Sequence, residues 1–396
     1  MNSTELKPGV HWVGGIDWDI RNFHGYLTQR GTTYNAYLIQ DEKNVLIDTV
    51  KPHFFDELLS RISSVMDPSK IDYIVSNHVE MDHSGALPLM LEHAPNAKVI
   101  TSVQGEKGLK RHFGDGMDLQ KVNSGDTLEI GKNTLHFVHT PMLHWPDNMV
   151  TWMPGEKILF SNDAFGQHIA TPQRFDDEVG WDILHEEAAK YFANIVLPYV
   201  DQGRKALDAL ADLDIGMIAT SHGVIWRSMI PQIVAKYDKW SRNETDQKAL
   251  IVYDTMWGST EKIALALQDG LEKAGVPVTR RNLKTTHISD IFTDLLTSKF
   301  ILIGSPTLNN GMLPTVGAFL TYLKGLRPRD RMGLAFGSFG WGGQAVGQVE
   351  DVMKELKWEF PQEKIRINYI PDADELVSVR DAAFEIGKKI IGETQK

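Results

Sequence analysis

The segment His78-Val79-Glu80-Met81-Asp82-His83 lies at the end of the apolar run 71–75, which is typical of a buried strand. It places four side chains able to bind a metal ion within six residues. If the chain turns tightly after the strand and enters a helix, alternate residues can point toward one metal position. Asp82 and His83 then turn toward a second position beside it. A single metal ion would not need so many ligands, so the segment predicts a site for two.

Three further candidate ligands follow other strand-like runs: His144 after 134–140, Asp163 after 157–160 and His222 after 215–219. Each of these histidines alone is more often a structural or surface residue than a ligand. Because the strands of one sheet bring their ends together, we expect the whole set to converge on one pocket. The set comprises His78, Glu80, Asp82, His83, His144, Asp163 and His222.

Composition narrows the classes of partner and ligand. The 396 residues include 41 Lys and Arg against 52 Asp and Glu, so the formal charge of −11 disfavours nucleic acid and anionic membranes as partners. The chain has no Cys, so any metal ion must be bound by His, Asp or Glu. No apolar run of ~18 residues is present, and the N-terminus lacks the long apolar core of a leader, so we expect a cytoplasmic protein.

A polar stretch at 241–248 marks the clearest composition shift, and we predict domains at 1–246 and 247–396. Before it, short alternating strands such as 33–40, 44–49 and 134–139 indicate a layered α/β or α+β domain. After it, buried strands near 249–253, 276–283, 300–303, 333–336 and 364–370 alternate with five helices. The helices are expected at 261–274, 288–298, 314–326, 344–356 and 374–391. This alternation predicts a doubly wound parallel sheet, which binds ligands at the carboxyl ends of its strands.

The loop Tyr253-Asp254-Thr255-Met256-Trp257-Gly258-Ser259-Thr260-Glu261 follows the first strand of the second domain. Its hydroxyl groups and Gly258 precede a helix directly, which is the arrangement of a phosphate-binding nest. The loop has neither a Walker lysine nor a Gly-x-Gly-x-x-Gly pattern, so a monophosphate fits better than a nucleoside triphosphate or a dinucleotide. Two later strand-end loops, 305–311 and 337–343, are placed to enclose a ring, with Phe339 and Trp341 stacking on it or flanking it.

The order His-x-Glu-x-Asp-His followed by His, Asp and His resembles the metallo-β-lactamase superfamily and, more narrowly, the flavodiiron proteins, also called A-type flavoproteins. The hydrolases of that superfamily usually have His where this chain has Glu80, and a carboxylate favours iron over zinc. The resemblance implies that His78, Glu80 and His144 bind one iron. It implies that Asp82, His83 and His222 bind the other and that Asp163 bridges the two. Two ferrous ions with three carboxylates leave a net charge of about +1, which favours bound anionic intermediates.

The loop at 255–260 resembles the FMN phosphate loop of flavodoxins, so the resemblance spans both domains and nearly the whole chain. It implies an N-terminal αββα sandwich and a C-terminal flavodoxin-like sheet of order 2-1-3-4-5, with FMN and two non-haem iron ions as cofactors. The FMN-binding residues expected from the three loops are Thr255, Met256, Trp257, Gly258, Ser259, Thr260, Pro306, Thr307, Leu308, Asn309, Asn310, Gly311, Ser338, Phe339, Gly340, Trp341, Gly342 and Gly343.

The family reduces dioxygen to water, nitric oxide to nitrous oxide, or both, and the resemblance implies that function here. Glu80 and Asp163 would be essential to it, and His24 and Tyr191 resemble residues beside the family's substrate pocket. The resemblance also implies a head-to-tail homodimer or a dimer of dimers, in which the partner's flavin serves each metal pocket. With no Cys for a fused rubredoxin domain, electrons are expected from a separate carrier such as a rubredoxin or reduced coenzyme F420.

Two other functions remain open from the residues alone. One is a dinuclear metal hydrolase that uses a metal-bound water, with the flavodoxin-like half as an accessory domain. The other is an electron-transfer flavoprotein whose N-terminal domain retains an idle metal pocket. Glu80 argues against the first, and the full set of ligand types argues against the second.

Overall fold

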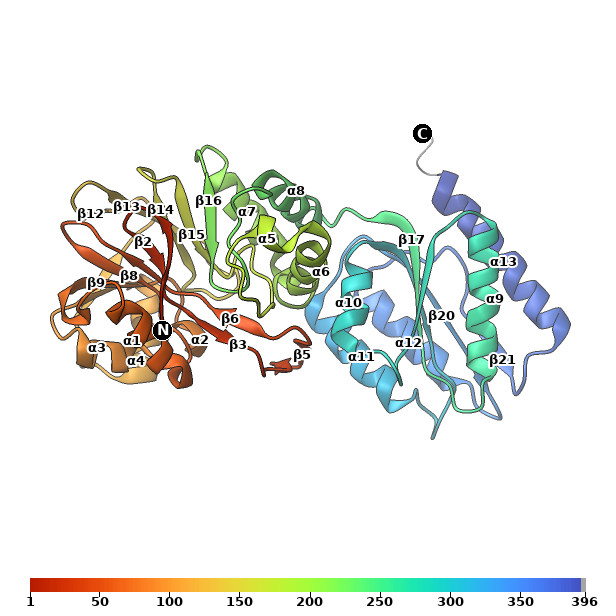
Figure 1. Ribbon diagram of the computed structural model, residues 1–396. Helices are drawn as coiled ribbons and strands as arrows, with labels where there is room; N and C mark the ends of the chain where they lie inside the picture. The colour runs from red at the N-terminus through yellow and green to blue at the C-terminus, as the bar shows by residue number, and fades with distance from the viewer. Residues whose placement is uncertain (393–396) are drawn as a thin grey trace. The chain divides into compact units, whose positions relative to one another are not determined.

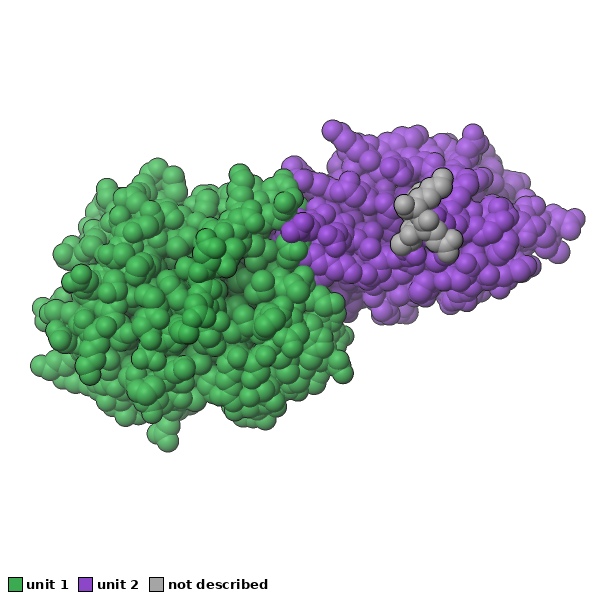
Figure 2. Space-filling model, turned by 90° about the horizontal axis from the view of Figure 1, so that it is seen from above, with its two compact units in different colours: residues 1–191, 199–238 green, residues 192–198, 239–396 purple. Residues whose placement is uncertain are grey.

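The computed structural model describes residues 1–392 and separates into two compact units. Among the described residues, one unit comprises 1–191 and 199–238, and the other comprises 192–198 and 239–392 (Figure 2). The predicted boundary between residues 246 and 247 lies at the start of β17 (Asp246–Tyr253), the first strand of the second unit. The domain limits 1–246 and 247–396 stay a prediction.

Two sheets form the centre of the first unit (Figure 1). The first has the order β1 (Thr4–Lys7), β2 (Val10–Trp12), β7 (Tyr37–Ile39), β8 (Asn44–Ile47), β9 (Ile71–Ser76), β10 (Lys98–Ser102) and β11 (Leu119–Val122). The second has the order β12 (Thr127–Glu129), β13 (Thr134–His139), β14 (Met149–Met153), β15 (Ile158–Asn162) and β16 (Met217–Thr220). Two antiparallel strand pairs stand outside both sheets: β3 (Gly15–Asp17) with β6 (Thr32–Tyr34), and the hairpin of β4 (Asn22–Phe23) with β5 (Tyr26–Leu27).

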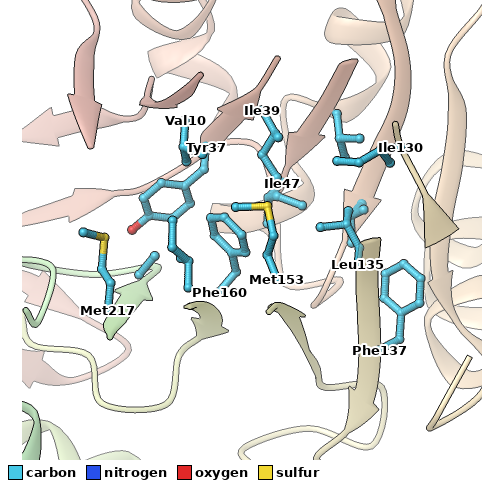
Figure 3. Close-up of a cluster of buried hydrophobic side chains, with 14 of the residues drawn as sticks. Val10, Tyr37, Ile39, Ile47, Ile130, Leu135, Phe137, Met153, Phe160 and Met217 are labelled. Atoms are coloured by element: carbon cyan, nitrogen blue, oxygen red, sulfur yellow. The ribbon is translucent and has the colours of Figure 1, made fainter. Parts of the chain in front are cut away.

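The core of this unit lies between the two sheets. Ile39 and Ile47 from the first sheet face Met153 and Phe160 from the second, and all four are almost fully buried (Figure 3). Because side chains alternate along a strand, Leu46 points to the opposite face of the first sheet. This alternation gives the first sheet two apolar faces, one for the second sheet and one for helices.

Helices cover the outer faces of both sheets. The first sheet packs through a second apolar cluster against three helices: α1 (Phe55–Ser63), α3 (Leu87–His93) and α4 (Val103–Phe113). On the second sheet, Leu210 of α7 (Val200–Leu210) packs against Val150 and Leu159. The αββα sandwich expected from the resemblance is therefore confirmed.

The prediction of one strand over 33–40 is wrong, because the chain changes direction at Asn35. The structure has β6 at Thr32–Tyr34 and β7 at Tyr37–Ile39, in different sheets. The buried side chain of Asn35 donates to the carbonyls of Thr220 (2.8 Å) and Gly223 (3.0 Å) and accepts from the Trp12 indole (2.8 Å). Such bonds favour a local bend over a continuous ladder, which the apolar pattern alone does not reveal.

The second unit is a parallel sheet with helices on both faces (Figure 1). Its strand order is β18 (Val278–Asn282), β17, β19 (Ser298–Gly304), β20 (Met332–Phe339) and β21 (Ile365–Asn368), and every pairing is parallel. One face is covered by α9 (Ser259–Lys273) and α13 (Ala373–Gly392), and the other by α10 (Ile288–Leu296), α11 (Pro314–Leu326) and α12 (Gln344–Glu355). The flavodoxin-like order 2-1-3-4-5 is confirmed.

No helix within residues 1–392 is both long and apolar enough to cross a bilayer. The cytoplasmic location expected from the sequence stays a prediction.

Candidate metal centre and flavin site

The segment after β9 turns sharply into the short helix α2 (Met81–Ser84). Glu80 is the residue preceding that helix and has an extended conformation, whereas Asp82 and His83 lie within the helix. Consecutive residues therefore leave the strand end in different directions, as the spacing predicted. This geometry lets one short segment face two neighbouring positions.

The other three candidates come from loops after strands of the second sheet. His144 lies between β13 and β14, Asp163 follows β15, and His222 follows β16. The structure brings all seven candidates into two adjacent groups, in each of which one donor atom per residue lies within 4.8 Å of the others. The first group is His78, Glu80, His144 and Asp163, and the second is Asp82, His83 and His222.

Asp163 stands between the two groups. Its Oδ2 lies 3.7 Å from Nε2 of His78 and 3.5 Å from Nε2 of His144. Its Oδ1 lies 3.2 Å from Nε2 of His83 and 3.4 Å from Nε2 of His222. One carboxylate thus directs one oxygen toward each group, which is the orientation that a bridging ligand requires.

Several donor atoms in this cluster are buried without a hydrogen bond of acceptable geometry. They are Nε2 of His78, Oδ1 of Asp82, Nε2 of His83 and both carboxylate oxygens of Asp163. Buried polar atoms are normally paired, and an unpaired one costs about 1–3 kcal/mol. Imidazole and carboxylate donors that share one pocket and lack other partners fit bound metal ions, so the residues present fit a diiron centre.

The ionisable groups of the cluster perturb one another strongly. Burial opposes ionisation of Glu80, but the neighbouring imidazoles of His144 and His78 outweigh it and hold the pKa of this carboxyl well below its usual range. Burial likewise opposes charge on the imidazoles, yet the nearby carboxylates of Asp163 and Glu80 raise the pKa of His144 to about 9. The nearby carboxylates of Asp163 and Asp82 raise the pKa of His222 to about 10. Three ionised carboxylates in one buried pocket favour cations there.

A cavity of about 540 Å³ reaches both groups and is lined by Glu80 and His144 of the first and by Asp82 of the second. His24, from the β4–β5 hairpin, also lines it, and Nε2 of His24 lies 3.0 Å from Oε1 of Glu80. Tyr191 is fully buried and is absent from this lining. Its ring lies 5.1 Å from that of His168 and 6.2 Å from that of His222. Of the two residues expected beside the substrate, only His24 therefore borders the cavity.

Sequence reasoning missed several residues around this centre. Lys51 and His112 line the cavity, and the ammonium of Lys51 lies 4.6 Å from the ring centroid of Phe23. The buried carboxylate of Asp147 accepts a hydrogen bond from Nδ1 of His78 at 2.8 Å. Only its position three residues after His144 could have indicated Asp147, because a lone Asp in a loop has no distinguishing pattern.

In the second unit, the predicted phosphate loop joins β17 to α9. Gly258 has a φ of +84°, and an added Cβ there would meet nothing within 4 Å, so the loop leaves open space at the start of α9. The first N–H groups of a helix have no partner within the helix and bind phosphate readily. This cradle fits the phosphate of FMN.

Two overlapping cavities, of about 130 and 480 Å³, lie at the carboxyl ends of the strands. Most of the expected FMN residues line one or both: Thr255, Met256, Trp257, Ser259, Pro306, Thr307, Leu308, Asn309, Asn310, Ser338, Phe339, Gly340, Trp341 and Gly342. Gly258, Thr260, Gly311 and Gly343 line neither cavity. Tyr369 lines both and was missed, although it directly follows β21, where the strand-end rule could have found it.

Comparison with known proteins agrees with this two-part architecture. A family model described as "ODP family beta lactamase" matches residues 32–223, and the flavodoxin model matches residues 251–382. The two matches fall in the two units that contain the metal-ligand cluster and the strand-end cavities.

Full-length relatives match both parts at once. The chain is 43% identical to a nitric oxide reductase of Moorella thermoacetica, over 97% of each chain. It is 41% identical to a rubredoxin-oxygen oxidoreductase of Megalodesulfovibrio gigas, over 98% of each. A solved flavodiiron protein of Giardia intestinalis superimposes with a TM-score of 0.96 at 37% identity, covering 99% of this chain and 97% of that one. From its two domains, its cluster of seven ligand-type side chains and these relatives, the chain belongs to the flavodiiron protein family of oxidoreductases.

Proposed function

We propose that this protein reduces dioxygen to water, nitric oxide to nitrous oxide, or both, with electrons from an external carrier. The observation that carries the proposal is the pair of adjacent ligand groups with one oxygen of Asp163 directed toward each. The family implies FMN and a non-haem diiron centre. When bound, the irons supply open positions for a diatomic gas, and the flavin supplies the electrons that reduce it.

The ligand roles follow the two groups. His78, Glu80 and His144 would bind one iron, and Asp82, His83 and His222 would bind the other. Asp163, with one oxygen directed toward each group, would contribute to both. The orphaned atoms of His78, His83 and Asp163 support this assignment, because each already points into the cluster and needs a partner.

The protein also supplies groups that border the reaction without binding metal. His24 stands at the cavity wall and can donate a hydrogen bond to Glu80 or to a bound substrate. Tyr191 lies behind the second group, and burial together with the negative charge of Asp163 raises the pKa of its hydroxyl well above the usual value. Tyr191 therefore stays protonated and acts as a hydrogen-bond donor.

In the flavin site, the loop at 255–260 would bind the FMN phosphate, and the loops at 306–311 and 338–343 would enclose the ring. The second unit leaves Trp257 and Trp341 94% and 93% exposed. At the mouth of the metal cavity, Met81 and Trp145 are partly exposed as well. The proposal includes the head-to-tail homodimer that the family implies, in which the flavin and metal cavities of different chains meet.

The electron donor is a separate carrier, either a rubredoxin or reduced coenzyme F420. A rubredoxin is tested first, because one relative is named for it.

Metal and flavin contents of anaerobically purified protein test the proposal. We expect about two irons and one FMN per chain, and consumption of dioxygen or nitric oxide when reduced rubredoxin is added. Zinc in place of iron after iron-replete expression, with ester or thioester hydrolysis, would replace the proposal with the metal hydrolase. FMN without metal would indicate a pure electron-transfer flavoprotein.

A further inference from the structure

The imidazoles of the metal cluster are held in different ways. Nδ1 of His78 donates to the carboxylate of Asp147 at 2.8 Å, and Nδ1 of His222 donates to the backbone carbonyl of Thr33 at 2.7 Å. Nδ1 of His83 is buried without a hydrogen bond. Across residues 1–392, His78 is thus the one imidazole of the ligand set that is hydrogen-bonded to a carboxylate outside that set.

Asp147 holds the backbone as well as the ring. The same oxygen, Oδ2, accepts from Nδ1 of His78 and from the backbone N–H of Val79, both at 2.8 Å. The residue is itself fixed, because it is 5% exposed and its carbonyl accepts a bond from the Ser102 hydroxyl at 2.7 Å. One carboxylate thus clamps the segment that carries both His78 and Glu80.

This contact has a direct chemical consequence. An imidazole that donates through Nδ1 keeps its lone pair on Nε2, and Nε2 of His78 is the atom that lies toward Glu80 and Asp163. The negative charge of Asp147 also makes that lone pair a stronger donor to a cation. Neither His83 nor His222 has this support from a charged group.

We propose that Asp147 is a positioning residue that sets the affinity of the metal ion bound at His78, by fixing the tautomer and the direction of that imidazole. The inference rests on the proposed dinuclear centre but concerns a residue outside the ligand set. Removing Asp147 weakens one of the two metal sites and spares the other.

Cobalt(II) titration of metal-free, FMN-loaded protein tests this, with the visible cobalt bands and the bound metal per chain as readouts. The wild type should bind two cobalt ions. Asp147→Ala should bind one as before and the other about 10–100-fold more weakly, the range found when such outer partners are removed. Asp147→Asn retains an acceptor of the same shape and should recover part of the loss, and it serves as the main variant if Asp147→Ala does not fold.

Asp176→Asn is the matched control. Asp176 is also a buried carboxylate of the first unit, but it accepts from the backbone N–H groups of Arg227, Ser228 and Met229 and from no imidazole. We expect this variant to titrate like the wild type even if it unfolds more easily.

A spectroscopic signature separates a positioning role of Asp147 from a general loss of order around the metal ligands. In zinc-loaded protein with ¹⁵N-labelled histidine, the Nδ1–H protons of His78 and His222 should both exchange slowly. Asp147→Ala should lose the His78 signal and keep the His222 signal, which serves as an internal reference because its acceptor is Thr33.

Two results would overturn the inference: wild-type cobalt affinity in Asp147→Ala and Asp147→Asn, or equal weakening of both metal sites in either variant. A wild-type protein that binds fewer than two cobalt ions would overturn the proposed function itself, and the inference with it. The wild-type stoichiometry therefore distinguishes the two failures.

Discussion

The two candidate sites are built on opposite principles. The metal cluster consists of ionisable side chains from four separate segments, nearly all of them buried. The flavin cavities are formed by loops that follow the strands of one sheet, and their linings contain no Asp, Glu, Lys, Arg or His. The first site is thus set by charge and donor atoms, and the second by loop shape and backbone N–H groups.

This contrast predicts how each site responds to substitution. A buried cluster of carboxylates is stable only with compensating cations, so the loss of one ligand affects the whole cluster. A neutral site distributes its binding over many weak contacts, so single substitutions there should have graded effects. The predictions below test this difference, from the largest expected effect to the smallest.

Asp163→Ala should abolish the function of the metal site alone. Because Asp163 faces both groups, its loss should remove at least one metal ion and lower gas reduction by at least about 100-fold. FMN content should stay at the wild-type level, since the flavin loops lie in the other unit. Turnover at the wild-type rate without metal would contradict the diiron assignment, and Glu80→Ala should give the same loss of activity.

Ser259→Ala should weaken FMN binding without affecting the metals. The hydroxyl lies at the start of α9, and a hydrogen bond to a charged group contributes about 1.5–3 kcal/mol, or ~10–100-fold in affinity. Fluorescence titration of flavin-free protein measures this. Riboflavin, which lacks the phosphate, is the control ligand, and it should bind the wild type and Ser259→Ala with equal affinity. An equal loss of affinity for riboflavin and FMN in the variant would place Ser259 at the ring instead.

Glu187 shows that a buried carboxylate of the first unit behaves differently outside the cluster. Burial raises its pKa to about 7 although Arg30 is paired with it at 2.8 Å. Because the folded-state value exceeds the unfolded one, its contribution to stability is complete below about pH 4.5 and is lost as the pH rises through 7. Between pH 4.5 and 8, this carboxyl should lower the free energy of unfolding of the wild type in urea by about 1–3 kcal/mol. In Glu187→Gln, this part of the decrease should be absent. An unchanged pH profile would show that Glu187 is ionised throughout.

Trp341→Ala tests the exposed aromatic edge of the flavin site. Since the side chain is 93% exposed, the stability of a single protomer should change by less than about 0.5 kcal/mol. If the residue lies in a head-to-tail interface, the dimer dissociation constant should rise about tenfold. Sedimentation at several concentrations measures both species, and an unchanged constant would place Trp341 outside any interface.

The fold was predictable where local pattern and topology agree. In the second unit, helix 314–326 matches α11. The βα alternation predicts the doubly wound parallel sheet, whereas its strand order was implied by the family resemblance. In the first unit, the prediction failed at Asn35, where side-chain bonds to Thr220 and Gly223 override the apolar pattern. A bond between residues so distant along the chain leaves no local signal.

The sequence by itself determined the candidate ligands, because imidazole and carboxylate groups at strand ends have few other uses when they occur together. It also determined the phosphate loop, since glycine and hydroxyl residues before a helix form a nest from local backbone geometry alone. Only the tertiary structure decided that Asp163 faces both ligand groups, that Asp147 holds His78, and that Tyr369 borders the flavin cavities. The physical reason is that hydrogen bonds and ligand directions depend on distances of a few ångströms between segments far apart in sequence, and only packing of the two sheets and their helices fixes those distances.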